Sequence, residues 1–159
     1  MNKKSASNKN CDGVYESFGV DLNWNYGYKF GYDEIGSSSN PCDEQYWGTH
    51  AFSEPEIAAM WDFLVSHKDI KIALNLHAWG NLLITPYNYD DDWKNMHLLN
   101  DPINVAYEDI RDNSGLPRGN LYGSGIQSIY YTANGDANDY MLHELWIFAI
   151  TSELGTSNR

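Results

Sequence analysis

One histidine and one glutamate stand at the ends of two apolar runs in this sequence. The segment KIALNLHAWGNLLIT begins at Lys71, and its first apolar run ends in His77. A second run, WIFAITS, begins at Trp146 and ends in Glu153. An imidazole and a carboxylate at strand ends are typical of a metal site or of general acid–base catalysis. A core histidine with satisfied hydrogen bonds beside Trp79 is the structural alternative.

The other histidines do not decide between these alternatives. None of the five begins a His-x-x-Glu or His-Glu-x-x-His motif, and no complete zinc motif is present. By spacing alone, both interpretations stay open. Four histidines are scattered along the chain: His50, His67, His97 and His143.

The apolar runs predict the strands that position the two ionisable side chains. The apolar run of Ile70, Ile72, Ala73, Leu74 and Leu76 is too short for a buried helix and too continuous for a half-exposed strand. It predicts a central strand over 70–77 that is covered on both faces. A short strand at 82–85 follows a polar break, and the run before Glu153 predicts the last strand. In open α/β sheets, ligands bind at the carboxyl ends of strands. The sequence therefore predicts a site at the end of a buried sheet.

Three helical segments are predicted around these strands. Ser53–Glu56 has the form of a capping box with proline in the first turn, and the apolar residues after it recur at helical spacing. A second amphipathic helix is predicted after Asp101, with Gly115 as its end. A short helical turn fits 138–144.

Loops take up much of the rest of the chain. Residues 1–13 are polar and predicted to be loop, and a short strand is predicted at Phe18, Val20 and Leu22. The Gly-, Asn- and Tyr-rich segment that follows predicts a long ordered loop, which in a compact domain usually carries function. The aspartates of 90–92 lack the spacing of a calcium loop and are interpreted as a solvated loop or helix start.

Length and charge limit the possible functions. The 159 residues fit one domain, and a formal net charge of −12 argues against nucleic acid and anionic membranes as partners. No apolar run approaches the roughly 20 residues of a membrane span. The basic start of the chain lacks the apolar middle of a signal peptide, so no targeting signal is predicted. Cys11 and Cys42 allow one disulfide, worth roughly 3–4 kcal/mol, or two free buried thiols.

Several blocks in the same order resemble the zinc metallocarboxypeptidases of the carboxypeptidase A/B family. These blocks are GVDLNWNYGYKFGY, GSSSNPCDEQYWG, AFSEPE, IALNLHAWGNLLITPY, IYYTANGDANDY and TSELG, and they span about Phe18 to Gly155. The resemblance implies an α/β fold: a mixed, twisted sheet with helices on both faces and the site at the strand ends. It also implies that residues 1–159 are part of a catalytic domain truncated at both ends.

The resemblance assigns roles to individual residues. His77 matches the third ligand of one zinc ion, whose other two ligands are expected before Met1 in a His-x-x-Glu pair. Glu153 matches the general base, Tyr131 the mobile tyrosine that closes over the substrate, and Asn23 an asparagine that contacts the terminal carboxylate. Cys11 and Cys42 match a pair that some members bridge.

The resemblance also implies a specificity pocket. Asn138 matches the position that is apolar in A-type and acidic in B-type enzymes, so a neutral pocket for uncharged C-terminal side chains is expected. Other pocket positions are matched by Ile84, Ile126, Ala133 and Thr151.

The departures from the family pattern weaken the expected activity. Trp24 stands where the family has an arginine for the substrate carboxylate, and an indole offers one N–H and no charge. None of the three arginines matches a substrate-binding position. The expected function is removal of C-terminal residues from peptides and proteins by a zinc enzyme, a monomer in a secreted or lumenal compartment. The alternatives are a pseudo-peptidase that binds without cleaving, and a truncated product with no independent function.

Overall fold

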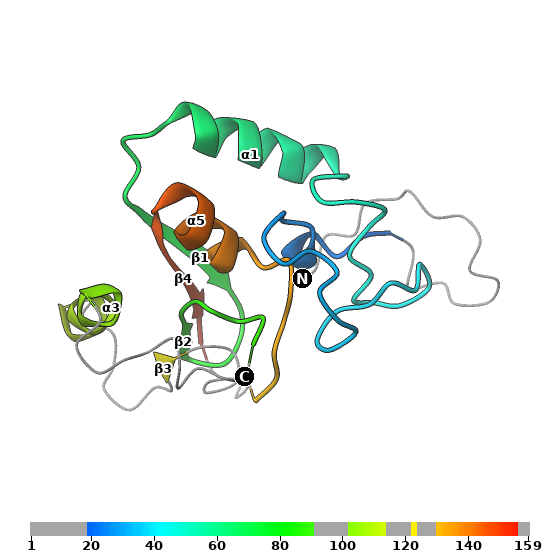
Figure 1. Cartoon of the computed structure of the whole chain (residues 1–159). Helices are drawn as coiled ribbons and strands as arrows, with labels where there is room; N and C mark the ends of the chain where they lie inside the picture. The colour runs from blue at the N-terminus through cyan, green and yellow to red at the C-terminus, as the bar shows by residue number, and fades with distance from the viewer. Residues whose placement is uncertain (1–18, 91–101, 114–121, 124–129, 156–159) are drawn as a thin grey trace.

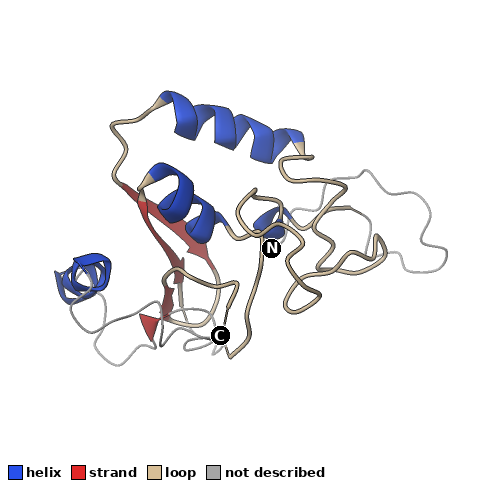
Figure 2. Cartoon of the chain, in the orientation of Figure 1, coloured by secondary structure: helices blue, strands red, loops and turns tan. Residues whose placement is uncertain are grey.

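The computed structural model describes residues 19–90, 102–113, 122–123 and 130–155 (Figure 1). In chain order, the described elements are η1 (Leu22–Trp24), α1 (Pro55–Ser66), β1 (Ile72–His77), β2 (Leu82–Ile84), α3 (Pro102–Asn113), β3 (Tyr122–Gly123), α5 (Ala137–Leu145) and β4 (Phe148–Glu153). Figure 2 shows that tan loops make up the side of the molecule away from α3.

The sheet is mixed and has the order β1-β4-β2-β3 in the described part of the chain. β4, the last strand in sequence, lies between β1, to which it is parallel, and β2, to which it is antiparallel. β3 pairs in parallel with β2. Because β1 and β4 run in the same direction, their carboxyl ends meet at one edge, with His77 opposite Glu153 in the register.

Helices pack on both faces of β4. Leu64 of α1 and Met141 of α5 form a buried cluster with Ala149, whereas Tyr107 of α3 lies in a second cluster with Ile150. Successive strand residues point to opposite faces, so the two clusters cover opposite sides of β4. The predicted α/β class with helices on both faces is confirmed.

The prediction that β1 is a central strand covered on both faces is wrong for the described residues. β1 is the first strand in the described sheet, and Ile72, Leu74 and Leu76 are 58%, 62% and 65% exposed. The alternate residues Ala73, Asn75 and His77 are partly buried on the side of α1 and α5. A continuous apolar run indicates that both faces of a strand favour burial. It does not indicate whether other residues of the same chain pack on both faces.

The helix at α1 is confirmed, but its predicted capping box is wrong. Glu54 is the N-cap, and no side chain caps the helix. The Ser53 hydroxyl donates to Glu54 Oε1 and accepts from Asn25 Nδ2 instead. Pro55 occupies the first turn, as predicted. The Ser53 hydroxyl therefore bonds to a side chain of the long loop, although the local motif predicts that it caps the helix.

The other predicted elements agree with the structure except at their ends. α3 and α5 lie where helices were predicted, and β4 starts two residues late because Trp146 adopts a left-handed conformation (φ 55°) that ends α5. Leu22 begins the 3₁₀ helix η1 and is not part of a strand. Phe18 and Gly115 lie outside the described residues.

Two further features bear on the setting of the protein. Cys42 is disulfide-bonded, and Cys11, the other cysteine in the sequence, lies outside the described residues. In the described part of the chain, no helix combines the length and apolarity that crossing a membrane requires.

Candidate active site

His77 and Glu153 lie side by side at the carboxyl ends of β1 and β4. His77 Nδ1 is 3.8 Å from Glu153 Oε1, and the Leu154 N–H donates to the His77 carbonyl oxygen at 2.9 Å. The backbone ladder thus sets the separation of the two side chains, which are 36% and 18% exposed. The predicted juxtaposition of His77 and Glu153 is confirmed, while their chemical roles stay predictions.

The environment of Glu153 favours a proton acceptor. Burial raises the pKa of the Glu153 carboxyl above its usual value, and the nearby His77 opposes this increase. Burial also raises the pKa of Tyr131, with the charge of Glu153 as the second cause. A carboxyl with a raised pKa is better matched to proton transfer near neutral pH.

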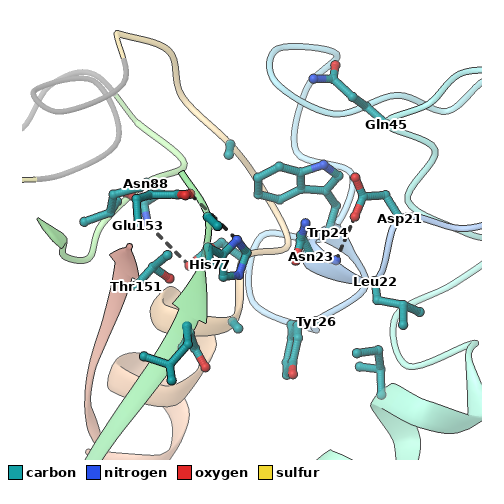
Figure 3. Close-up of a pocket in the computed structure, with 18 of the residues that line it drawn as sticks. Asp21, Leu22, Asn23, Trp24, Tyr26, Gln45, His77, Asn88, Thr151 and Glu153 are labelled. Carbon is teal, nitrogen blue, oxygen red and sulfur yellow. Dashed lines mark hydrogen bonds and ion pairs between the residues drawn. The ribbon is translucent and has the colours of Figure 1, made fainter. Parts of the chain in front are cut away.

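A cavity of about 530 Å³ opens beside these residues. Figure 3 shows its two sides: His77, Glu153, Thr151 and Asn88 near the strand ends, and Asp21, Asn23 and Trp24 on the loop opposite. Tyr131 also lines the cavity and is 41% exposed. The volume falls within the usual range for small-molecule and peptide side-chain sites, about 300–1,000 Å³.

The loop wall of the cavity is held by buried polar side chains. The Asp21 carboxylate caps η1 by accepting from the Asn23 N–H at 3.1 Å. Asn25 is fully buried, and its Nδ2 donates to Trp47 O and His50 O while its Oδ1 accepts from the Glu54 N–H. These hydrogen bonds therefore fix η1, with Asn23 and Trp24, against the loop that precedes α1.

The loop that carries Tyr131 packs closely on η1. The Tyr26 N–H donates to the Gly135 carbonyl oxygen at 3.0 Å. Gly135 has φ 69°, and a Cβ there would lie 2.4 Å from the Trp24 carbonyl oxygen. Only glycine tolerates both this conformation and this approach, which brings the two walls of the cavity together.

Trp24 lines the cavity but leaves one polar atom unsatisfied. Its Nε1 is buried without a hydrogen-bond partner among the described residues. A buried unpaired N–H costs about 1–3 kcal/mol. The indole thus fills space at the position where the family pattern has a guanidinium, without replacing its hydrogen bonds.

Asn138 lies beneath the cavity, in a network that uses its whole amide. It is completely buried, with Nδ2 donating to Thr151 Oγ1 at 3.0 Å and to Ile84 O at 3.3 Å. Its Oδ1 accepts from Asn75 Nδ2 at 2.6 Å. Asn138 is not among the residues that line the cavity, whereas Asn75, Thr151 and Ile84 are. Asn138 therefore acts on the cavity through these three residues.

Two carboxyl side chains lie at the start of α5, next to this network: Asp136 is the N-cap and Asp139 is in the first turn. Asp139 is buried and accepts from the N–H groups of Asn88 and Tyr89. Burial raises the pKa of Asp139 well above its usual range, and the charge of Asp136 adds to this. Burial likewise raises the pKa of Asp136, against the opposing effect of its hydrogen bonds. Asp136 also lines the cavity, and no sequence motif predicted that it would.

The structure brings most of the predicted site residues together. The cavity is lined by His77, Glu153, Asn23, Tyr131, Thr151, Ile84 and Ala133. Ile126 lies outside the described residues. Asp136 could have been recognised from the sequence as the N-cap of α5, since an aspartate just before a helix is a common cap. The sequence gives no signal that this cap also faces the cavity.

The described residues do not form a complete metal centre. They contain no group of three His, Cys, Asp or Glu side chains placed to hold a metal ion. Glu44 lines the cavity, whereas Asp43 and His50 do not. A catalytic zinc uses three protein ligands, so His77 alone does not meet the requirement.

Comparison with known proteins agrees with this fold and identifies the family. The chain belongs to the zinc carboxypeptidase family, whose model matches residues 1–159. It is 32% identical over 160 residues to carboxypeptidase A5 of Macaca fascicularis, covering 100% of this chain and 36% of that protein. It is 34% identical over 142 residues to carboxypeptidase A1 of Bos taurus, covering 89% of this chain and 33% of that protein. The chain thus spans about a third of the length of these relatives.

Solved structures give the same assignment. Bovine thrombin-activatable fibrinolysis inhibitor, in complex with tick carboxypeptidase inhibitor, is similar with a TM-score of 0.68 and 30% identity over 98% of this chain and 51% of that one. Carboxypeptidase A from Helicoverpa armigera is similar with a TM-score of 0.70 and 27% identity over 99% of this chain and 38% of that one. The fold is that of the zinc carboxypeptidases.

Proposed function

We propose that this chain carries the proton-transfer side of a metallocarboxypeptidase site, which removes C-terminal residues from peptides and proteins. The observation that carries the proposal is the pairing of His77 with Glu153 at the edge of a cavity that Tyr131 also lines. Family membership supports the reaction class.

Each residue has a role that its surroundings support. Glu153 acts as the general base because it is mostly buried and its pKa is raised. Tyr131, on the loop before Gly135, lies within electrostatic range of Glu153 and covers the bound substrate. Asn23, held at the start of η1, contacts the terminal carboxylate. Asn138 sets the shape of the pocket through Thr151.

Zinc is the proposed cofactor, with His77 as one ligand. Because the described residues hold no complete ligand set, no catalytic step is assigned to the metal. The proposed setting is a monomer in a secreted or lumenal compartment, which the disulfide of Cys42 supports because disulfides persist in oxidising compartments.

A second function is a pseudo-peptidase that binds peptide C-termini or another partner without cleavage. The observation that favours it is Trp24, whose buried Nε1 has no partner among the described residues and supplies no charge for a carboxylate. The two functions differ in whether Glu153 takes part in chemistry.

A chimera tests the proposed reaction. The segment of bovine carboxypeptidase A1 that precedes the region matched by this chain is fused upstream, and Trp24→Arg is introduced. We expect zinc-dependent removal of the last residue from a peptide with a free C-terminus but not from its C-terminal amide. Glu153→Gln should lower kcat by about 10²–10⁴-fold while bound zinc, measured by elemental analysis, is unchanged.

The outcome that contradicts the proposal is a folded chimera with stoichiometric zinc that either fails to trim the peptide or trims it equally well after Glu153→Gln. Failure to trim together with retained binding of the free-acid peptide would support the pseudo-peptidase.

A further inference from the structure

We propose that Asp139 is a positioning residue that fixes Asn88 in the cavity wall and, through Asn88, the loop that carries Tyr131. Asp139 does not line the cavity itself. It acts through the segment Tyr87–Tyr89, which follows β2 and contributes Asn88 to the lining. This inference rests on the proposed function, because it names a residue that shapes the proposed substrate site.

Both oxygens of the Asp139 carboxylate accept hydrogen bonds from two consecutive backbone N–H groups. The Asn88 nitrogen lies 2.9 Å from Oδ1 and 2.8 Å from Oδ2, and the Tyr89 nitrogen lies 3.2 Å from Oδ2. The donors precede Asp139 by 51 and 50 positions, and Asp139 is only 1% exposed. A buried carboxylate that binds two main-chain donors fixes both the place and the direction of their segment.

The needs of helix α5 do not explain an acid at this position. An acidic side chain in the first turn interacts favourably with the helix dipole, but an exposed one does so as well. The N–H groups at the start of α5 bond to Asp136, not to Asp139. Burial raises the pKa of Asp139 well above its usual range, and within the described part of the chain no salt bridge offsets this. The contacts that stabilise the Asp139 carboxylate are therefore those to Asn88 and Tyr89.

Asn88 transmits this constraint to two other parts of the cavity. Its carbonyl oxygen accepts from the Ala133 N–H at 2.7 Å, and its Nδ2 donates to Asp136 Oδ1 at 3.3 Å. All three residues line the cavity, and Figure 3 shows Asn88 on the same side as Glu153. Because Ala133 is two positions after Tyr131, its bond to Asn88 fixes one end of the loop that carries Tyr131.

The residues on either side of Asn88 do not line the cavity. Tyr87 and Tyr89 pack against Tyr28, with ring centroids 5.9 Å and 5.6 Å from it. Lys29 Nζ lies 4.7 Å from the centroid of the Tyr89 ring. Aromatic and cation–π contacts thus hold the side chains of this segment, whereas Asp139 bonds its backbone to α5.

The test compares Asp139→Asn with the parent in the isotope-labelled 159-residue chain, so it needs neither zinc nor turnover. Asparagine keeps the size of the side chain but has no charge and only one acceptor oxygen. We expect amide hydrogen exchange, followed by NMR, to accelerate about tenfold to a hundredfold more at Asn88, Tyr89 and Ala133 than at Leu154. The Leu154 N–H is the reference because it bonds across the ends of β1 and β4.

Tyr107→Phe is the matched control for a general loss of stability. Tyr107 is 2% exposed, and its hydroxyl donates to the Ala149 carbonyl oxygen at 3.1 Å. It lies in the cluster on the other face of β4 and has no contact with the cavity lining through this bond. Losing the bond should accelerate exchange equally at Asn88 and Leu154.

Asp139→Ser keeps one acceptor oxygen without a charge and provides a second measurement if the asparagine variant does not fold. The inference is overturned if the variant that folds accelerates exchange equally at Asn88 and Leu154, because Asp139 then supports the whole fold and not this wall. It is also overturned if exchange at Asn88 and Tyr89 keeps its parental rate, or if neither variant folds.

The zinc-loaded chimera with Trp24→Arg separates this inference from the proposed function. There, Asp139→Asn should raise KM for a peptide acid about tenfold and change kcat much less, because the pairing of β1 with β4 places His77 and Glu153. An unchanged KM would overturn the inference, since the wall that Asp139 positions would then not bind substrate. A chimera that fails to trim with Asp139 intact contradicts the proposed function, and the exchange rates then decide the inference alone.

Discussion

His77 and Glu153 are register partners on two parallel strands, and their Nδ1 and Oε1 atoms lie 3.8 Å apart. The backbone hydrogen bonds between β1 and β4 set this distance, including the bond from Leu154 N–H to the carbonyl oxygen of His77. Replacing either side chain should therefore leave the backbone position of the other unchanged. The chemical contribution of each side chain can therefore be tested by substitution while the strand pairing is retained.

Glu153→Gln is expected to stabilise the chain at neutral pH. Burial raises the pKa of Glu153 in the folded chain, so the ionised carboxylate opposes folding at pH values above its folded pKa. Glutamine removes this penalty. The free energy of unfolding, measured with urea at pH 7, should increase, and the gain should disappear below the unfolded pKa of about 4.3.

Glu144→Gln provides the control for this prediction, because Glu144 is an exposed glutamate on α5. Its effect at pH 7 should be within about 0.5 kcal/mol of zero. A Glu153→Gln variant that is less stable than the parent at pH 7 would mean that the ion pair with His77 outweighs the cost of burial.

The sequence predicts the site better than the sheet that carries it. His77 and Glu153 could be recognised because each interrupts an apolar pattern, and the structure brings them together. The exposed face of β1 could not be predicted, since Ile72 and Leu74 have the same pattern whether or not the chain covers them. Apolar residues indicate that a strand face favours burial, but they do not indicate which residues will pack against it.

Polar contacts between residues far apart in the chain also could not be predicted from the sequence. The amide of Asn138 bonds to Asn75, 63 positions earlier, and no local pattern links the two. Similarly, Ser53 is withdrawn from its capping box by Asn25, which is 28 positions away. Local motifs predict a helix well, but the fold decides which side chains are free to take part in them.

Asn138→Asp is expected to destabilise the chain by about 2–4 kcal/mol at pH 7, or roughly 10 °C in the unfolding midpoint. The substitution replaces two donated hydrogen bonds, to Thr151 Oγ1 and Ile84 O, by an oxygen that faces another carbonyl oxygen. It also places a charge at a fully buried position. Thermal unfolding followed by circular dichroism measures the change.

The same substitution at Asn113 is the control. Asn113 is exposed on α3, and its Nδ2 donates to the Asp109 carbonyl oxygen at 2.8 Å. Asn113→Asp should change stability by about 0.5 kcal/mol or less. Equal effects at the two positions would contradict the view that the Asn138 amide is essential to the floor beneath the cavity.

Trp24→Arg is expected to raise the affinity for peptides with a free C-terminus by about tenfold to a hundredfold. A guanidinium supplies charge-assisted, bidentate hydrogen bonds to a carboxylate, whereas the indole of Trp24 has one N–H that is buried. Isothermal titration with a peptide acid and its amide measures the gain. Trp24→Gln, which adds donors without charge, should gain much less. An equal increase for the amide would mean that the introduced guanidinium acts on the peptide by another contact.

The unmodified 159-residue chain is expected neither to hold zinc tightly nor to trim peptides. Its described residues provide no group of three ligands, and a single imidazole binds zinc weakly. Elemental analysis after desalting should therefore find far less than one zinc per chain, and mass spectrometry should find peptides intact. Stoichiometric zinc together with efficient C-terminal trimming would contradict this prediction.

The zinc ligand set and the residue at position 24 concern different steps, so changes to them should have separate effects. A chimera with the upstream segment of bovine carboxypeptidase A1 should recover zinc whether Trp24 is kept or replaced by arginine, because the cavity wall at η1 contributes no zinc ligand in the family pattern. Turnover should recover fully only when Trp24→Arg is added, since the substrate carboxylate otherwise lacks a cationic partner. Comparing kcat/KM for the two chimeras at equal zinc content isolates the second repair. A chimera that retains Trp24 and matches the arginine variant in kcat/KM would mean that this chain binds the substrate carboxylate by residues other than the one at position 24.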